Sequence, residues 1–122
     1  MSKKTITPQG IKSVGPYSPA VNVGNMLFLS GQIGLIEGKI PKEFKDEATN
    51  AIQNALILVE NAGFDKKNIV KVEIYLKDIR NYPLLNEIYS KFIPSPFPAR
   101  VVVEVSNLPK NANIEISMIA VK

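Results

Sequence analysis

Residues 98–121, PARVVVEVSNLPKNANIEISMIAV, decide the fold of this 122-residue chain. Two runs rich in β-branched residues predict two strands, and the Leu-Pro-Lys sequence at 108–110 predicts the turn between them. Arg100 lies at the start of the first predicted strand, and Glu115 lies inside the second. An arginine and a carboxylate on neighbouring strands can hold a small molecule that bears a carboxylate and can move a proton on it.

Upstream of this stretch, the sequence predicts a hairpin, two helices and one further strand. The hairpin is marked by Gly24-Asn25, a two-residue turn of the kind that tolerates positive φ. Apolar residues spaced three and four apart predict the helices, and a period of two predicts the strand. This order predicts a single α+β domain over residues 1–122, with one mixed sheet and both helices on one face. The predicted bounds are 20–33 for the hairpin, 44–62 and 82–92 for the helices, and 69–77 for the strand.

The alternation of residue types assigns side chains to the two faces of the sheet. In the strand at 69–77, one face carries Val70, Val72, Ile74 and Leu76. In the two C-terminal strands, the face covered by the helices is assigned Val101, Val103, Ile114 and Ile116. The opposite face is assigned Arg100, Val102 and Glu115. Since that face mixes apolar and charged residues, we expect other subunits to bury it in a homo-oligomer.

The composition excludes several classes of chemistry, because the chain has no Cys and no His. Disulfides, thiolate nucleophiles and zinc sites of the Cys/His kind are ruled out. A Ser-His-Asp triad is ruled out as well. Any acid–base catalysis must therefore use Asp, Glu, Tyr, Lys or a bound water.

The charge balance is mildly basic, with 15 Lys and Arg against 11 Asp and Glu, for a net charge of +4. This excess suits anionic ligands in general, but the charges are scattered along the chain and do not single out nucleic acid. No apolar run approaches the ~20 residues that span a bilayer, and no apolar segment of a signal peptide follows the N-terminus. We expect a cytoplasmic protein without a membrane partner.

Arg100 and Glu115 are the strongest candidates for chemistry, and each has a plainer alternative. Arg100 could bind a carboxylate through its two-pronged guanidinium group, or it could be a surface arginine or part of a subunit salt bridge. Glu115 stands in mid-strand, where Glu is unfavourable. Either its face is solvated, or partial burial raises its pKa toward the range of a general acid or base.

The remaining candidates are weaker on their own. Ser30 offers a hydroxyl, and Gly31 could let a ligand approach the main chain closely, although a bulge or tight packing explains the pair equally well. Tyr17 lies in a stiff Gly-Pro-Tyr-Ser-Pro turn and could close a pocket, or it could simply pack. Asn86 and Tyr89 share one side of the second predicted helix, where packing is the plainer explanation.

Taken together and in order, six motifs resemble the Rid family of reactive intermediate (enamine/imine) deaminases. Members of this family are also catalogued as YjgF proteins and as L-PSP endoribonucleases or translation inhibitors. The resemblance covers nearly the whole chain. The motifs are Gly15-Pro16-Tyr17-Ser18-Pro19-Ala20, Leu29-Ser30-Gly31-Gln32-Ile33-Gly34, Asn86-Glu87-Ile88-Tyr89, Pro98-Ala99-Arg100, Leu108-Pro109 and Ile114-Glu115-Ile116.

The resemblance implies a fold like that of bacillary chorismate mutase and a homotrimer with active sites between subunits. It also implies hydrolysis of 2-iminobutanoate and 2-iminopropanoate to 2-oxo acids and ammonia. These imines are released by pyridoxal-phosphate-dependent dehydratases, and the Rid protein itself needs no cofactor and no metal. The implied partners are small 2-imino and 2-oxo acids, and the scattered charges do not favour nucleic acid as a partner.

The resemblance also implies roles for individual residues. Arg100 matches the arginine that grips the substrate carboxylate, and Glu115 matches the acid that positions the attacking water. Val102 stands where many members have Cys, and the backbone carbonyl at that position is the group expected to contact the water. The pocket residues implied by the resemblance are Tyr17, Ser30, Gly31 and Asn86.

Two other classes of function remain open. The older family label suggests an endoribonuclease, which would need an unusual acid–base set of Glu, Arg and Tyr in the absence of His. The other class is a trimer that binds a small metabolite without catalysis. The rate of imine hydrolysis separates these alternatives from the deaminase.

Overall fold

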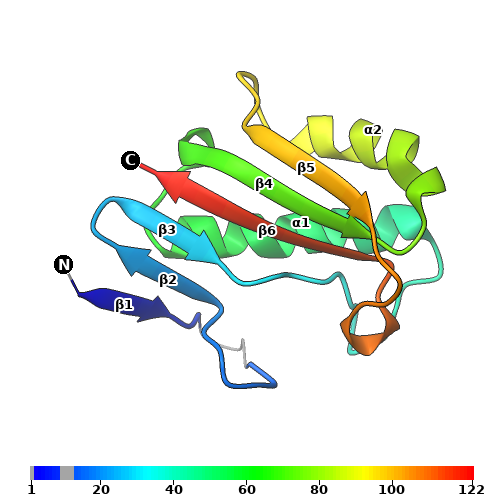
Figure 1. The fold of residues 1–122 in the computed structure, drawn as a ribbon, viewed down its shortest axis with the longest axis horizontal. Coiled ribbons are helices and arrows are strands. Elements are labelled where there is room, and N and C mark those ends of the chain that lie inside the picture. The colour runs from blue at the N-terminus through cyan, green and yellow to red at the C-terminus, as the bar shows by residue number, and fades with distance from the viewer. Residues whose placement is uncertain (1, 9–12) are drawn as a thin grey trace.

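The two longest strands, β4 (Ile69–Leu76) and β6 (Ile114–Val121), pair antiparallel near the centre of the sheet. In β6 every second residue is buried, as in any sheet with one covered face. The computed structural model describes residues 2–8 and 13–122. Its six strands have the order β1-β2-β3-β6-β4-β5 (Figure 1). The other four strands are β1 (Lys3–Ile6), β2 (Ala20–Val23), β3 (Met26–Leu29) and β5 (Ala99–Glu104).

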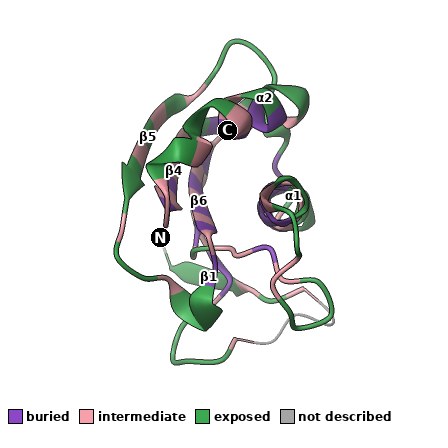
Figure 2. Cartoon of the chain, turned by 90° about the vertical axis from the view of Figure 1, so that its right-hand side faces the viewer, coloured by how far each residue is buried: buried purple, intermediate pink, exposed green. Residues whose placement is uncertain are grey.

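Helices α1 (Phe44–Asn61) and α2 (Tyr82–Phe92) lie on the same side of β4, β5 and β6 (Figure 2). Strand β5 runs parallel to β4, so the sheet is mixed, and the predicted α+β architecture with both helices on one face is confirmed. Short 3-10 turns complete the connections at Lys66–Asn68, Ile79–Asn81 and Pro109–Asn111.

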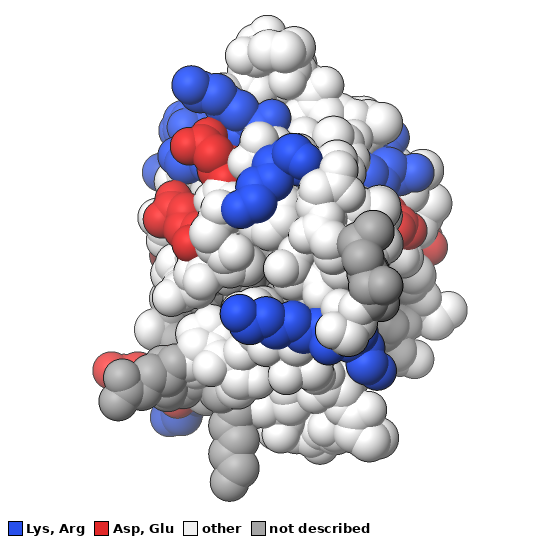
Figure 3. All heavy atoms as spheres, turned by 90° about the vertical axis from the view of Figure 1, so that its left-hand side faces the viewer, with Lys and Arg blue, Asp and Glu red and all other residues white. Residues whose placement is uncertain are grey.

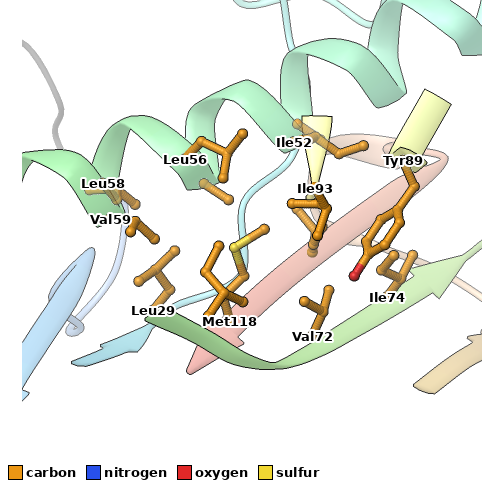
Figure 4. Close-up of a cluster of buried hydrophobic side chains, with 14 of the residues drawn as sticks. Leu29, Ile52, Leu56, Leu58, Val59, Val72, Ile74, Tyr89, Ile93 and Met118 are labelled. Atoms are coloured by element: carbon orange, nitrogen blue, oxygen red, sulfur yellow. The ribbon is translucent and has the colours of Figure 1, made fainter. Parts of the chain in front are cut away.

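The hydrophobic core fills the space between the helices and the sheet. Side chains from α1, from the sheet, and from α2 and the residue that follows it meet there, as Figure 4 shows. Each fully buried Leu, Ile or Val contributes about 1.5–3 kcal/mol relative to an exposed one. The labelled side chains are Leu29, Ile52, Leu56, Leu58, Val59, Val72, Ile74, Tyr89, Ile93 and Met118.

The local turns follow the predictions closely. Gly24 has φ of 57° in the turn between β2 and β3, and Gly63 has φ of 84° just after α1. Both are left-handed conformations that glycine adopts at little cost. Strand β1 was not predicted, because Lys3–Ile6 shows no alternation and only Ile6 packs against the core.

The predicted assignment of the β5 side chains to the two faces of the sheet is wrong. Arg100 pairs with Val72 of β4, and Val102 pairs with Ile74, so both point toward the helices. Val101 and Val103 lie on the open face of the sheet and are 42% and 41% exposed. A run of three valines carries no alternation of its own, so the register with β4 decides which of them point inward.

The prediction that Val70 lies on the same face of the sheet as Val72 is also wrong. The pairing of β4 with β6 shifts register between Ile69 and Lys71. This irregularity turns Val70 outward, where it is 45% exposed, and buries Ile69 in its place. The rest of β4 keeps the predicted alternation.

Candidate functional site

A pocket of about 550 Å³ lies where the chain leaves β3, and we call it the Glu115 pocket. It brings together four of the residues predicted from sequence, although they come from three separate segments of the chain. Lys110, in the turn before β6, also lines it and has φ of 57°. The predicted residues in this pocket are Tyr17, Ser30, Gly31 and Glu115.

Gly31 and Glu115 are fitted to each other in this pocket. A Cβ atom on Gly31 would lie 2.6 Å from Cδ of Glu115 and 2.9 Å from its Cγ, and it would overlap the carboxylate oxygen. The carboxyl group therefore occupies the space that any larger residue at position 31 needs. The glycine is required for this close approach.

Ser30 fixes the loop that carries Tyr17. Its hydroxyl donates a hydrogen bond of 2.6 Å to the carbonyl of Ser18, and its N–H donates one of 2.9 Å to the carbonyl of Pro19. These two bonds hold the 15–19 turn against the end of β3. The Ser30 hydroxyl thus shapes the pocket through the loop, and it keeps acceptor capacity for a ligand.

Burial raises the pKa of the Glu115 carboxyl group above its ordinary value. Its cross-strand neighbour on β4 is Tyr75, whose hydroxyl donates a hydrogen bond of 3.1 Å to Glu73. The pKa of Tyr75 is raised as well, first by burial and then by Glu73 and Glu115. Tyr75 lines neither pocket, and it stands beside the site as the cross-strand neighbour of Glu115.

A second pocket, of about 370 Å³, lies between α2 and the start of β5, and we call it the Arg100 pocket. It contains the predicted pair Arg100 and Asn86, and its remaining walls are mostly apolar. The other lining residues are Tyr89, Ser90, Phe97 and Pro98.

The Arg100 guanidinium group is held by neutral partners. Its Nη2 donates to Oδ1 of Asn86 at 2.7 Å and to the Tyr82 hydroxyl at 3.2 Å. The group also lies 4.7 Å from the centre of the Tyr89 ring, which Figure 4 shows pointing toward the sheet. The pKa of Tyr89 is raised by burial and lowered by the Arg100 charge to a smaller extent.

No carboxylate of residues 2–8 and 13–122 pairs with Arg100, since the one ion pair found there joins Arg80 to Asp78 at 2.7 Å. Within the same residues, only Nη2 of the Arg100 guanidinium group makes hydrogen bonds. A guanidinium group with a fixed position, free donors and no counter-charge is suited to binding an anion through two parallel hydrogen bonds.

Within one subunit, the two pockets are separate. Glu115 pairs with Tyr75 on β4, whereas Arg100 pairs with Val72, three residues earlier and on the opposite face. That offset alone is roughly 10 Å along the strand. Val102 lines neither pocket, because its side chain packs against the core. The sequence placed all of these residues in one site, whereas a single subunit holds them in two pockets. Its placement of Arg100 and Glu115 on one face of neighbouring strands was wrong, because β4 lies between β5 and β6.

Other classes of site find little support in the structure. In the described part of the chain, no group of three or more acidic side chains could hold a metal ion. No helix among these residues is long and apolar enough to cross a membrane. On the face drawn in Figure 3, Lys and Arg side chains lie in separate groups, with acidic and uncharged surface between them.

Comparison with known proteins places this arrangement in a family. The family model described as Endoribonuclease L-PSP matches residues 7–122. A protein of Dermatophagoides farinae named 2-iminobutanoate/2-iminopropanoate deaminase is 42% identical over 126 residues, which cover 99% of this chain and 98% of the relative. A RutC family protein of Aquifex aeolicus is 46% identical over 120 residues, which cover 95% and 96%.

Solved structures agree with the sequence comparison. The crystal structure of Escherichia coli TdcF with bound serine superposes with a TM-score of 0.92 at 34% identity, and the match covers 98% of both chains. The fold and the sequence therefore indicate the same family. This chain belongs to the Endoribonuclease L-PSP family, which is the Rid (YjgF) family that its sequence motifs resemble.

Proposed function

We propose that this protein hydrolyses small 2-imino acids, such as 2-iminobutanoate and 2-iminopropanoate, to 2-oxo acids and ammonia. The observation that carries the proposal is chemical complementarity between the two pockets. One pocket holds a guanidinium group without a counter-charge, and the other holds a carboxyl group whose pKa is raised by burial. A 2-imino acid needs both groups, one for its carboxylate and one for its reacting carbon and nitrogen.

The two groups come together if each active site forms between subunits. Val101 and Val103 leave apolar surface on the open face, next to Tyr75 of β4, which in turn pairs with Glu115 of β6. Strand β5 is also the edge of the sheet, so half of its backbone groups are free to pair with another chain. We therefore propose a homotrimer in which Arg100 of one subunit faces Glu115 of the next.

In this site, Arg100 binds the substrate carboxylate through two parallel hydrogen bonds, and Asn86 and Tyr89 hold the guanidinium group in place. Glu115 accepts a proton from water as its oxygen attacks the imine carbon. The nitrogen of the tetrahedral intermediate takes that proton from Glu115 and then a second one from the newly formed hydroxyl group, by way of the same carboxylate. The C–N bond breaks, ammonia leaves, and the carbon remains as the ketone of the 2-oxo acid. A carboxyl group with a raised pKa is suited to both proton transfers.

Tyr17, Ser30, Gly31 and Val102 complete the proposed site in different ways. Ser30 and Gly31 shape the Glu115 pocket, and the Tyr17 ring closes its rim. Because the Val102 side chain packs against the core, the part of this residue that remains for a ligand is its backbone. This explains how Val can replace the Cys of many members at this position.

Two named relatives support the choice of substrate. A protein 42% identical to this chain is named 2-iminobutanoate/2-iminopropanoate deaminase, and a structural neighbour was crystallised with serine, an amino acid of the same size class. The endoribonuclease in the family description is a weaker candidate. The sequence has no His for acid–base chemistry, and on the one face drawn in Figure 3 the basic side chains form no continuous surface, so RNA is the less favoured substrate.

The decisive experiment generates 2-iminobutanoate in situ with a threonine dehydratase and follows the release of 2-oxobutanoate. Adding this protein should raise the rate of release in proportion to its concentration, and the Glu115→Gln variant should not. A folded oligomeric protein that leaves the rate at its spontaneous value would overturn the proposal. A parallel assay with purified RNA tests the endoribonuclease.

A further inference from the structure

Glu47 is a fully buried acidic residue that the proposed reaction does not use. It lies in the first turn of α1 with 0% exposure. Its two carboxylate oxygens accept hydrogen bonds from one residue, Asn113, at 2.7 Å from the backbone N–H and 2.8 Å from Nδ2. No cation of the described residues lies within ion-pair distance of Glu47. A buried carboxylate without a cation costs stability compared with an apolar residue of similar size, so its presence calls for a role.

The residue that Glu47 holds controls the entry into β6. Asn113 directly precedes the strand, and its carbonyl accepts a hydrogen bond of 3.0 Å from the N–H of Lys77 at the end of β4. Two residues later, the strand presents Glu115. Only Ile114 separates Asn113 from Glu115, so anchoring Asn113 to α1 fixes where the strand that carries Glu115 begins.

The same side of α1 also holds the opposite wall of the Glu115 pocket. Asn50 donates a hydrogen bond of 2.7 Å to the carbonyl of Leu35, and Asn54 donates one of 3.0 Å to the carbonyl of Ile33. Both Leu35 and Ile33 line the pocket. Between them, Gly34 packs on the backbone of α1, where a Cβ would lie 2.8 Å from the carbonyl carbon of Glu47.

We propose that Glu47 is a positioning residue for the Glu115 pocket. Through Asn113 it ties the start of β6 to α1, the helix that also holds the 33–35 segment. It thereby fixes the Glu115 carboxyl group against Gly31 and keeps it in its partly buried place. This inference rests on the proposed hydrolysis for its catalytic consequence, but the positioning itself can be measured without any turnover.

The test compares three variants. Glu47→Leu removes both hydrogen bonds, and Asn113→Ala removes only the side-chain bond. Glu47→Gln keeps the pattern, because its Oε1 still accepts from the Asn113 N–H and the Asn113 amide can turn to accept from its Nε2. Val59→Ala is the matched control, since it weakens the same helix at a buried position about 18 Å away along the axis.

Three quantities are measured on each folded variant: imine turnover, 2-oxobutanoate binding, and the Glu115 pKa by carboxyl ¹³C NMR. Glu47→Leu should lower turnover by roughly 10-fold or more, with binding to Arg100 within about 2-fold of wild type. The Glu115 pKa should fall toward its ordinary value as the carboxyl group moves into solvent. Asn113→Ala should give a smaller shift in the same direction, and Glu47→Gln should stay within about 2-fold of wild type.

The inference is overturned if Glu47→Leu leaves both turnover and the Glu115 pKa unchanged, or if Val59→Ala changes them as much. If Glu47→Leu does not fold, an Asn113→Ala protein with wild-type turnover and wild-type Glu115 pKa overturns it equally. A loss in Glu47→Gln as large as in Glu47→Leu also counts against it. Were the wild type to lack imine hydrolysis, the proposed function would fail, and the NMR titration would still decide whether Glu47 positions Glu115.

Discussion

Gly31 and Glu115 cannot both keep their places if a methyl group is added to Gly31, because that carbon would lie 2.6 Å from Cδ of Glu115. The obstacle is the far end of a flexible side chain, and this side chain can rotate away. Gly31→Ala should therefore displace the carboxyl group and leave the fold intact. We expect imine hydrolysis to fall by about 10²-fold, with the melting temperature within a few degrees of wild type.

Gly34→Ala is the matched control for this prediction. There, an added Cβ would lie 2.8 Å from the carbonyl carbon of Glu47 and 3.0 Å from the N of Ala51, which are backbone atoms of α1. A helix backbone cannot rotate away, so this variant should lose stability by roughly 2 kcal/mol or more. Equal effects of the two alanines on thermal unfolding would contradict the distinction drawn between a side-chain and a backbone obstacle.

Arg100→Ala should remove most imine hydrolysis, and Arg100→Lys should restore little of it. Lysine keeps the charge but loses the planar group that binds a carboxylate at two points. The loss should amount to roughly 2–4 kcal/mol, or about 30- to 1000-fold in kcat/KM. Arg80→Ala, which breaks a surface pair with Asp78, is the control and should keep wild-type activity. Near-normal turnover in a folded, oligomeric Arg100→Ala protein would exclude this role.

The open face of the sheet is expected to be the subunit interface. Val103 is 41% exposed in the single chain, and a charged residue in its place would have to be buried at that interface. Val103→Asp should therefore dissociate the trimer and abolish hydrolysis, whereas Ile57→Asp, at a 48% exposed position of α1, should do neither. Light scattering at micromolar concentration measures the mass of the assembly for each variant. A wild-type mass near 13.4 kDa would remove the interface and the shared site together.

Much of this molecule could be predicted from sequence, for reasons that the structure makes clear. The helices were found because α1 and α2 each bury one apolar face, and Gly24 and Gly63 marked turns that need positive φ. The motifs also contain the predicted residues that line the pockets, but they did not show that one subunit holds these residues in two separate pockets. Each motif is a short continuous segment, and its residues enter one pocket together.

What could not be predicted depends on pairing between strands. The valines at 101–103 fit either face, so the orientation of β5 was decided by its register with β4. For the same reason, Arg100 was wrongly placed beside Glu115. Glu47 escaped notice because its partner, Asn113, lies far away in the sequence at the start of β6. No local pattern signals such contacts.

Glu115 should make the protein's stability depend on pH in an unusual direction. Burial raises its pKa in the folded state, so folding favours the neutral carboxyl group. The favourable contribution is complete below the ordinary carboxyl pKa and is lost as pH rises through the raised one. Because Gln cannot ionise, Glu115→Gln should gain stability relative to wild type between acid and neutral pH. Urea unfolding at pH 4 and pH 7.5 measures this, and a difference independent of pH would contradict it.

The same Glu115→Gln variant separates deaminase from nuclease. Gln keeps the shape of Glu and most of its hydrogen bonding, but it cannot exchange a proton at neutral pH. The variant should therefore retain assembly and 2-oxo acid binding while imine hydrolysis falls by on the order of 10²-fold or more, the usual contribution of a positioned acid–base group. Any RNA cleavage by the preparation should be unaffected and should disappear on further purification. If Glu115→Gln instead left imine hydrolysis intact and abolished a reproducible RNA cleavage, Glu115 would belong to a nuclease, and the assignment of Arg100 to a substrate carboxylate would fall with it.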